Sequence, residues 1–436
     1  MLDKLIRIVK KSFVEIGDVR YQNTQYPISD YLQSCFAMFS LKDPSMHQYR
    51  LNYGERRSNL ERVYGIKKLP TESTLRAAID KLAPHDLQKT FKPLLQVVEK
   101  EGIMKEYRVL GKYQSIAFDG TEHYCSCDSA CEHCLTKVHK NKKGEITQTS
   151  YHHQALSGVL VHYGHKEVFP IACEAIVRQD GDTKNDCELN AGKRLLPIIR
   201  QMLPEAEGGN KGYKLLGIFD GLYPNGPFIK ALQAINMRFI IGIKEGYVLV
   251  QIENLKKEGE LSAHQWVNDK GNTCIAKWSN DLILNGSNQD ITVNYFEYEE
   301  LNKKGQRLFF GTWITDISII KQNIEELVKI GRSRWKIENE TFNTLKNQGY
   351  YLEHSYGHGQ KFLSTNFMLL TFLAFLTDQI VQKLDTDFNW AWKTCVTKKK
   401  LWEKIRQVFD LLPCMSMNVI FRFINKEITI DFPLLI

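Results

Sequence analysis

Two aspartates occupy the same short sequence context, Phe-Asp-Gly, at widely separated points of the chain. Asp119 follows the apolar run Ser-Ile-Ala-Phe, and Asp220 follows Leu-Leu-Gly-Ile-Phe. Each run predicts a strand that ends at the aspartate, where the glycine allows the backbone to turn. If the two strands are neighbours in one sheet, both carboxylates meet at its edge, where a divalent cation would relieve their repulsion. A lone Asp-Gly pair is most often a simple turn, so the prediction depends on the two together.

A third carboxylate is available on a predicted helix, in the segment RSRWKIENETFNTLK at residues 332–346. Glu338 follows Arg334 by four residues, which places both side chains on one helix face. Glu340 is the alternative and points about 200° away on an ideal helix. A solvent-facing ion pair is the other role open to Glu338. Three carboxylates, Asp119, Asp220 and Glu338, would hold Mg²⁺ or Mn²⁺, cations that activate water or a 3′-hydroxyl for attack on a phosphodiester.

A cluster of cysteines and histidines lies between the two aspartates. The chain has 10 cysteines and no visible export signal, so its thiols should be reduced and their clustering suggests metal ligation. The Cys-x-x-Cys spacing is typical of tetrahedral zinc sites, although reduced cysteines without a metal also fit a short loop. His152, Cys125 and Cys127 are rival ligands. The predicted ligands of a structural Zn²⁺, which would pin the connection between the first two strands, are Cys131, Cys134, His139 and His153.

Composition is that of a folded protein with a modest basic excess. Lys and Arg number 58 against 50 Asp and Glu, a net charge of +8 that permits a polyanionic partner without demonstrating one. The first 21 residues predict an amphipathic helix and not a secretory signal, which favours a cytoplasmic protein. The longest apolar run, 362–381, is interrupted by polar residues and predicts a buried core helix instead of a membrane span.

The order of predicted elements defines the expected fold. Residues 1–105 show helical periodicity and form an N-terminal helical domain. Three strands are then followed by helix, strand, helix and strand, which is the order of an RNase H-like α/β core with a mixed sheet flanked by helices. We predict five parts: the helical domain at 1–105, the first part of the core at 106–245, a β-rich insertion at 246–311, the second part of the core at 312–385 and a C-terminal segment at 386–436.

With these residues in place, the sequence resembles the DDE transposases of bacterial insertion sequences, close to the family called insertion sequence four. The resemblance spans roughly residues 20–380 and is most specific in RSRWKIENETFNTLKNQGYYLEHSYGHG. Arg334, Glu338 and Lys346 fall on or next to that family's tyrosine, arginine, glutamate, lysine signature. Gly331 occupies the tyrosine position, and Lys346 lies one residue beyond the usual spacing. The segments QDGDTKNDCELNAGKRLL and FDGLYPNGPF are similar to the family too.

The resemblance implies an activity and its partners. It implies a DNA transposase that cleaves DNA and transfers strands with Mg²⁺ or Mn²⁺, in which Asp119, Asp220 and Glu338 are catalytic. Arg334 and Lys346 would then bind substrate phosphates. The expected partners are double-stranded DNA, as terminal inverted repeats and target, and further copies of the chain in a homodimer or larger complex. The expected location is the bacterial cytoplasm at the nucleoid, with no membrane contact.

Two alternatives and two further DNA contacts accompany this interpretation. An RNase H-like nuclease without strand transfer, or a domesticated DNA-binding protein, would use the same scaffold. The aromatic segment 349–361 offers stacking by Tyr350 and Tyr351, for which core packing is an equal explanation. Basic residues in 51–68 would reach DNA phosphates or form a solvated helix face, namely Arg56, Arg57, Arg62, Lys67 and Lys68.

Overall fold

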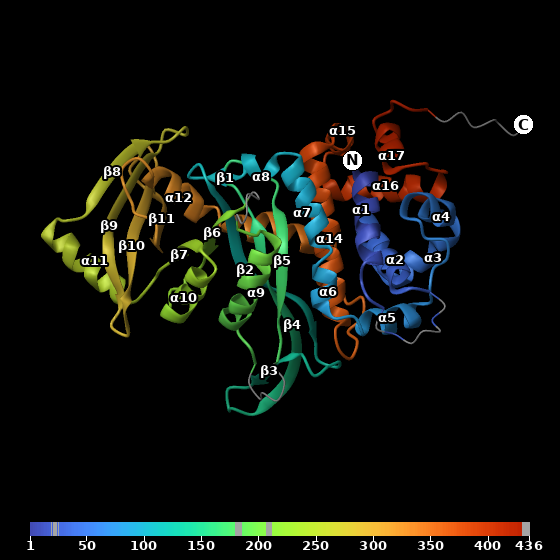
Figure 1. Cartoon of the computed structure of the whole chain (residues 1–436), viewed down its shortest axis with the longest axis horizontal. Coiled ribbons are helices and arrows are strands. Elements are labelled where there is room, and N and C mark those ends of the chain that lie inside the picture. Colours follow the sequence, from blue (N-terminus) through green and yellow to red (C-terminus); the bar gives the residue numbers. More distant parts are fainter. Residues whose placement is uncertain (19, 21–23, 25, 179–184, 206–211, 430–436) are drawn as a thin grey trace, which may run out of the picture.

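Strands and helices are segregated along the long axis of the molecule (Figure 1). The computed structural model describes residues 1–18, 20, 24, 26–178, 185–205 and 212–429. A β-rich region lies at the left of Figure 1, a sheet with flanking helices in the middle, and helices from both ends of the chain at the right. The predicted α/β class, a large mixed sheet flanked by helices, is confirmed.

One sheet of eleven strands runs through the part of the chain that the structure describes. Its order is β3-β4-β2-β6-β7-β11-β10-β9-β8, with β1 beside β2 and β5 beside β4. The strands are β1 (Arg108–Val109), β2 (Tyr113–Ser126), β3 (Leu135–Lys140), β4 (Ile146–Leu160), β5 (Phe169–Ile176), β6 (Lys214–Phe219), β7 (Met237–Gly242), β8 (Ser262–Val267), β9 (Thr273–Asn285), β10 (Asn288–Leu301) and β11 (Arg307–Thr315).

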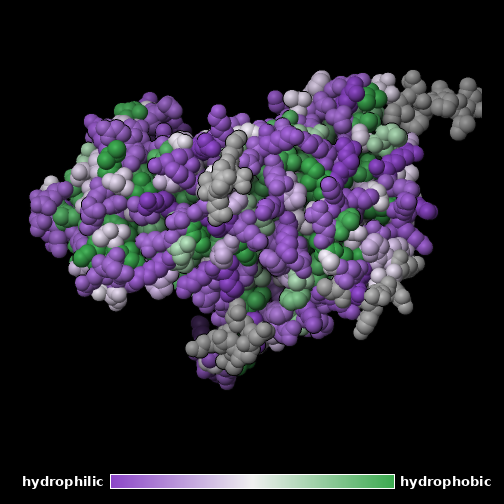
Figure 2. Space-filling model, viewed as in Figure 1, coloured by the Kyte–Doolittle hydropathy of each residue, from purple (hydrophilic) through white to green (hydrophobic). Residues whose placement is uncertain are grey.

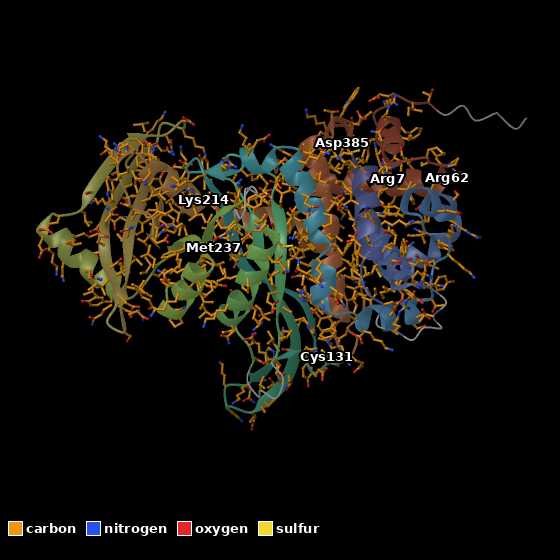
Figure 3. The ribbon with its side chains drawn as sticks, viewed as in Figure 1. Arg7, Arg62, Cys131, Lys214, Met237 and Asp385 are labelled. Carbon is orange, nitrogen blue, oxygen red and sulfur yellow. The ribbon has the colours of Figure 1, made fainter. Side chains whose placement is uncertain are left out.

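The central strands combine both orientations. β4 is antiparallel to its neighbours β2 and β5, whereas β6 and β7 run parallel to β2. The parallel strands are reached through helices α9 (Glu188–Met202) and α10 (Gly226–Ala234), as parallel pairing requires. Lys214 and Met237, at the starts of β6 and β7, lie close together in Figure 3.

The β-rich region extends this sheet. β11 pairs with β7, placing Trp313 opposite Gly242, so β8–β11 continue the central sheet. The region opens with a helix, α11 (Tyr247–Glu258), where the sequence predicts β structure. Val248 and Ile252 are buried one helical turn apart against β9, which explains a helix in this polar stretch. Gly259, in the left-handed conformation at φ 72°, ends it.

The helical unit is assembled from the beginning and the end of the chain. The Met1 amino group lies 3.0 Å from an Asp385 carboxylate oxygen, and Asp3 accepts the Met417 backbone N–H at 2.8 Å. The segment 386–436, as far as the structure describes it, therefore packs on the N-terminal helices. The helices are α1 (Leu2–Val14), α2 (Ile28–Leu41), α3 (Met46–Leu51), α4 (Tyr53–Asn59), η1 (Leu60–Tyr64), α5 (Glu72–Asp80), α6 (Pro84–Gln88), α7 (Phe91–Lys100), α8 (Ile103–Glu106), α14 (Leu363–Leu384), α15 (Thr386–Cys395), α16 (Lys398–Leu411) and α17 (Met417–Ile424).

The apolar helix α14 is the core of this unit. By length and composition it is the one helix among the described residues that would cross a membrane, yet every residue from Leu363 to Gln382 is buried. It packs on α2 and β5, between the helices and the sheet. The face of the molecule in Figure 2 is mainly hydrophilic with apolar residues interspersed. These observations fit the predicted core helix of a soluble protein.

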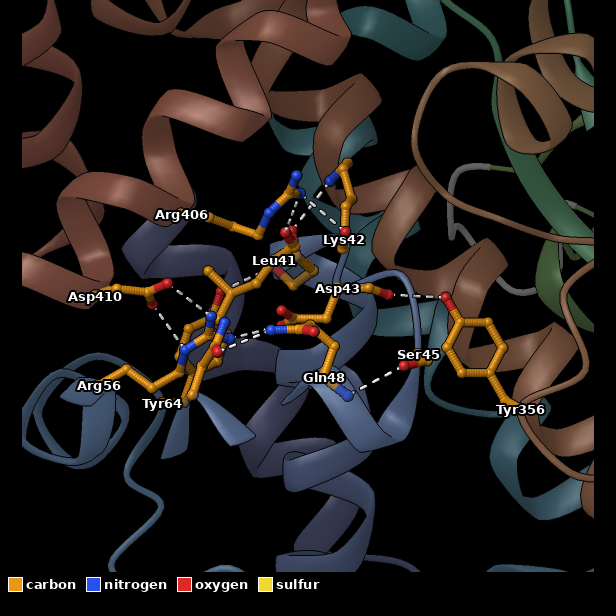
Figure 4. Close-up of polar contacts among 12 residues, drawn as sticks. Leu41, Lys42, Asp43, Ser45, Gln48, Arg56, Tyr64, Tyr356, Arg406 and Asp410 are labelled. Atoms are coloured by element: carbon orange, nitrogen blue, oxygen red, sulfur yellow. Dashed lines mark hydrogen bonds and ion pairs between the residues drawn. The ribbon is translucent and has the colours of Figure 1, made fainter. Parts of the chain in front are cut away.

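Arg56 belongs to the interior of the helical unit and not to a DNA-facing surface. Its side chain is fully buried and contacts Asp43 at 2.7 Å and Asp410 at 3.0 Å (Figure 4). The prediction that Arg56 reaches DNA is therefore wrong, because the guanidinium is enclosed between α4 and α16. The other four basic residues of that segment, Arg57, Arg62, Lys67 and Lys68, are exposed.

Candidate active site and metal centre

Asp119 lies in β2, and Asp220 directly follows the neighbouring parallel strand β6. The register of β2 and β6 runs from Tyr113 beside Lys214 to Ala117 beside Ile218, where the pairing ends. If the same register is continued by two residues, Asp119 comes beside Asp220, at the spacing of about 4.8 Å that separates neighbouring strands. The predicted turn at Asp119 is wrong, because β2 continues to Ser126 and pairs along its length with the long strand β4. β6 ends at Phe219, as predicted, and Asp220 follows it directly.

Arg334 connects the first aspartate to Glu338. Its Nη1 donates to Asp119 Oδ2 at 3.0 Å, and its Nη2 donates to Glu338 Oε1. Arg334 and Glu338 both follow α12 (Ile324–Arg332), and Glu338 lies in the π-helical turn η2 (Ile337–Phe342). Such turns are rare and are frequent at functional sites. The side chains of Asp119 and Glu338 are 18% and 50% exposed. The site therefore remains accessible to solvent beside Glu338, with Arg334 between the two carboxylates.

Glu188, at the start of α9, is a fourth carboxylate that the sequence analysis did not identify as a site residue. A methyl group on Gly120 would lie 2.4 Å from Glu188 Oε1, so the glycine leaves room for this side chain next to Asp119. The Tyr223 hydroxyl contacts Glu188 Oε2 at 3.4 Å. Two sequence signals could have indicated Glu188: its position after Asp186 and Cys187 at a helix start, and its place in the familial segment 179–196, of which residues 179–184 lie outside the described residues.

The electrostatics reflect crowded negative charge. Burial raises the pKa of Asp119 to about 7; the Arg334 guanidinium opposes this rise, and the Glu338 and Glu188 carboxylates reinforce it. Burial and then the Asp220 carboxylate raise the pKa of Glu188. Glu188 is thus within electrostatic reach of both Asp119 and Asp220. A bound cation would relieve the cost of ionising them all.

A cavity of about 1020 Å³ opens beside Asp220, between the central strands and the β8–β11 region. Cationic and aromatic side chains line the cavity together with Asp220. Trp335 and Phe310 are each 47% exposed there, which leaves their rings available for contact. Basic residues lining the cavity are Lys244, Lys256, Arg332 and Arg334. Glu253 and Glu297 also line the cavity; Lys256 pairs with both, and Arg332 pairs with Glu300. The cavity therefore combines charges of both signs with exposed rings next to Asp220.

Three other predicted residues lie apart from this group. Lys346 Nζ forms an ion pair with Glu353 at 2.7 Å. The Glu340 carboxylate acts on Lys336 and Lys398 instead of on the aspartates. Tyr350 is buried and donates to Asp378 at 2.5 Å, so core packing explains it. Of the two glutamates, Glu338 is the one at the carboxylate site.

A second group of ligand-type side chains converges beyond the far end of β2. Cys131, Cys134, His153 and His358 place one ligand atom each within 4.8 Å of one another. The two Sγ atoms are 3.8 Å apart, and His153 Nε2 lies 3.5 Å from Cys131 Sγ and 3.4 Å from Cys134 Sγ. His358 Nε2 lies 3.2 Å from Cys134 Sγ and 3.0 Å from His153 Nε2. Cys131 is labelled in Figure 3, near the base of β4.

Three of the four predicted zinc ligands are in this group, and His139 is not. His139 Nε2 contacts Ser150 Oγ at 2.8 Å on the β3–β4 hairpin, and His358, from the distant segment 348–362, occupies the fourth position. His152 has both ring nitrogens engaged, by Glu122 at 2.8 Å and Ser150 at 2.7 Å. The rival cysteines Cys125 and Cys127 are exposed and outside the group.

No protein-family model matches this chain, and no curated protein is significantly similar to it in sequence. Its functional interpretation therefore depends on the two sites themselves.

Proposed function

We propose that this chain is a DDE transposase with an RNase H-like core, which cleaves DNA and joins it to a target. The observation that carries the proposal is Arg334, which links Asp119 to Glu338; the β2–β6 register supports it, because two further residues in that register would bring Asp119 beside Asp220. Three antiparallel strands followed by helix-linked parallel strands are also the order expected of an RNase H-like core. The Arg334 and Glu338 match to the familial signature points to joining as well as cutting.

The donor set fits hard divalent cations. Asp119, Asp220 and Glu338 would hold Mg²⁺ or Mn²⁺, which when bound activates a water or 3′-hydroxyl and stabilises the leaving oxygen. Carboxylate oxygens are the ligands these ions prefer. Burial, with a smaller effect of the Glu338 and Glu188 carboxylates, raises the pKa of Asp119 despite Arg334, so a further cation would favour its anion. Glu188 lies close enough to orient or supplement the set.

The protein's own groups would position the substrate. Arg334 holds Asp119 and Glu338 in a fixed relation, and a guanidinium in this place can exchange a carboxylate for a phosphate of the DNA. The cavity beside Asp220 supplies further cations for the backbone and exposed rings for bases. DNA would thus run along the face between the central strands and β8–β11. Lys346 is not assigned a role.

The partners and location follow from the proposed reaction. The substrates are double-stranded DNA, as the terminal inverted repeats of the element and as the target. Because two ends must be brought together, the chain acts as a homodimer or larger complex. The bacterial cytoplasm, at the nucleoid, is where this DNA is found.

The test uses DNA that flanks the chain's own coding region, where the terminal repeats would lie. With Mg²⁺, the full-length protein should cleave this DNA and form strand-transfer products. Asp119→Asn, Asp220→Asn and Glu338→Gln should each lower cleavage by at least about 100-fold. Gel-shift binding of the same DNA should be retained. Glu340→Gln, on the same helical segment but directed elsewhere, is the matched control and should stay active.

The alternatives appear as distinct outcomes. Cleavage without strand-transfer product would identify an RNase H-like nuclease that does not join DNA. Binding without cleavage by the wild-type chain would identify a domesticated DNA-binding protein. Full cleavage by any of the three carboxylate variants would refute the assigned site.

A further inference from the structure

The Cys131, Cys134, His153 and His358 group has the dimensions of a tetrahedral zinc site. With Zn–S near 2.3 Å and Zn–N near 2.0–2.1 Å, tetrahedral ligands lie about 3.8 Å apart for two sulfurs, about 3.5 Å for a mixed pair and about 3.3 Å for two nitrogens. The observed separations are 3.8 Å for the sulfurs, 3.2–3.5 Å for mixed pairs and 3.0 Å for the nitrogens. Four donors surround one point at the spacing that a zinc ion would impose.

The surroundings favour a closed site. Cys134 and His153 are each 2% exposed, and all polar contacts of His153 run through Nε2. The Tyr124 ring stacks on His358 at a centroid distance of 4.5 Å and an interplanar angle of 10°. It also packs edge-on against His153 at 5.6 Å. An aromatic shell of this kind orients the imidazoles and keeps water away from a bound metal.

We infer that these four side chains bind one structural Zn²⁺, with His358 and not His139 as the fourth ligand. Two thiolates and two imidazoles in tetrahedral arrangement are a donor set that selects zinc. With four protein ligands, no position remains for water or substrate, so this zinc is structural. The inference goes beyond the proposed DNA chemistry and does not depend on it.

The zinc would connect three segments of the chain, of which the cysteine loop and β4 are already neighbours through the Leu135–His152 pair. His153 belongs to β4, the two cysteines to the loop after β2, and His358 to the connection between α13 (Asn343–Asn347) and α14. The helical unit already grips that connection, because Asp80 of α5 accepts the backbone N–H groups of residues 360–363 at 2.9–3.0 Å. Arg76 donates to the Tyr356 carbonyl at 3.1 Å.

A metal at this junction would therefore fasten three elements together. The connection that carries His358 begins shortly after the Glu338 turn and ends at the core helix α14. Zinc would tie it to the central sheet, while Asp80 and Arg76 tie it to the helical unit. Loss of the metal should loosen the residues around His358 first, while the buried Tyr350 and Tyr356 keep the rest of the connection attached to the helical unit.

The experiment measures the metal content of the full-length protein, purified without a histidine tag and dialysed against metal-free buffer. Mass-spectrometric metal analysis should find about one zinc per chain. Cys134→Ser and His358→Ala should lower this content to a small fraction. His139→Ala, His152→Ala and Cys127→Ser are matched controls from the same hairpin region and should retain the zinc. Cobalt exchanged into the site should give thiolate charge-transfer and tetrahedral visible bands.

His358→Cys keeps a ligand at the same position and should retain zinc even if His358→Ala folds poorly. Unchanged zinc content in soluble His358→Ala would overturn the assignment of His358. A wild-type chain that contains no zinc and has a Cys131–Cys134 disulfide by peptide mapping would overturn the metal site altogether. Neither result would affect the proposed carboxylate chemistry, since DNA cleavage is not the readout.

Discussion

Two arginines in this molecule make the same contact pattern in opposite surroundings. Arg56 bridges Asp43 and Asp410 with its side chain and that of Asp43 fully buried. Arg334 bridges Asp119 and Glu338, but Glu338 is half exposed and further carboxylates lie nearby. In the first case the charges are enclosed by helices and serve the fold. At the Arg334 site the carboxylates carry more negative charge than one guanidinium neutralises, and the site is open to cations from solvent.

The contrast shows how burial and surplus charge distinguish structure from chemistry. An arginine between two carboxylates is not by itself a functional sign. The surplus of carboxylates from two strands and two helical segments makes the Arg334 site a candidate for metal binding. Three sets of variants test this distinction.

The largest effect is expected from Arg56→Met. Removing one partner of a buried charge cluster leaves Asp43 enclosed without its cation, so the free energy of unfolding should fall by about 3–5 kcal/mol. Arg334→Met, at the open bridge, should lower it by about 1 kcal/mol or less, because solvent reaches Glu338 and Asp119 can take up a proton. Denaturant unfolding followed by circular dichroism measures both. Equal losses in the two variants would contradict the distinction.

A smaller effect is expected from Glu188→Gln. If this carboxylate supports the metal site without being a principal ligand, its loss should weaken Mn²⁺ binding by about 10–100-fold. The affinity is measured by titration calorimetry on the zinc-loaded protein. Glu353→Gln is the control, since that carboxylate pairs with Lys346 away from the aspartates. Unchanged affinity in Glu188→Gln would exclude this residue from the site.

The smallest effect concerns pH and Asp119. Its pKa is raised from 3.8 to about 7, so the folded state favours the protonated acid. This contribution to stability is fully present below pH of about 4 and is lost as the pH rises through about 7. The amide that replaces the carboxyl group in Asp119→Asn cannot ionise. In magnesium-free buffer, the melting temperature of this variant minus that of wild type should therefore increase between about pH 5 and about pH 8.

Added Mg²⁺ provides the check on this pH effect. At about pH 8 the ion should raise the melting temperature of the wild type more than that of Asp119→Asn, because only the wild type gains a carboxylate ligand. No chelator is used, because it would also remove the proposed zinc from Cys131, Cys134, His153 and His358. A melting difference that does not depend on pH would contradict the raised pKa.

Local pattern was enough to predict some of this structure. The apolar runs before Asp119 and Asp220 predicted two core strands, and the spacing of Arg334 and Glu338 predicted their contact. The run before Asp119 did not reveal that its strand continues, because Gly120 there makes space for Glu188 and not for a turn.

Local sequence pattern could not predict contacts between residues that are far apart in the sequence. His358 joins its group from 205 positions after His153, and Arg56 pairs with Asp410 across 354 positions. Nothing near His358 or Arg56 in the sequence distinguishes them from surface residues. The prediction of β structure at the start of the β-rich region was also wrong. Val248 and Ile252 are buried one helical turn apart, and their burial favours a helix there.

The helical unit is completed only when α14, far along the chain from α2, has been synthesised. α2 buries its apolar side chains against α14; Phe39 and Phe367 pack with ring centroids 5.8 Å apart, and Lys42 pairs with Asp378 at 2.6 Å. At about 5–20 residues per second, a ribosome needs about 20–70 s between these two helices. Throughout that interval the face of α2 that later packs on α14 is uncovered, although α1 and α5 already pack on other parts of the helix, so the growing chain depends on temporary protection of this one face until α14 emerges.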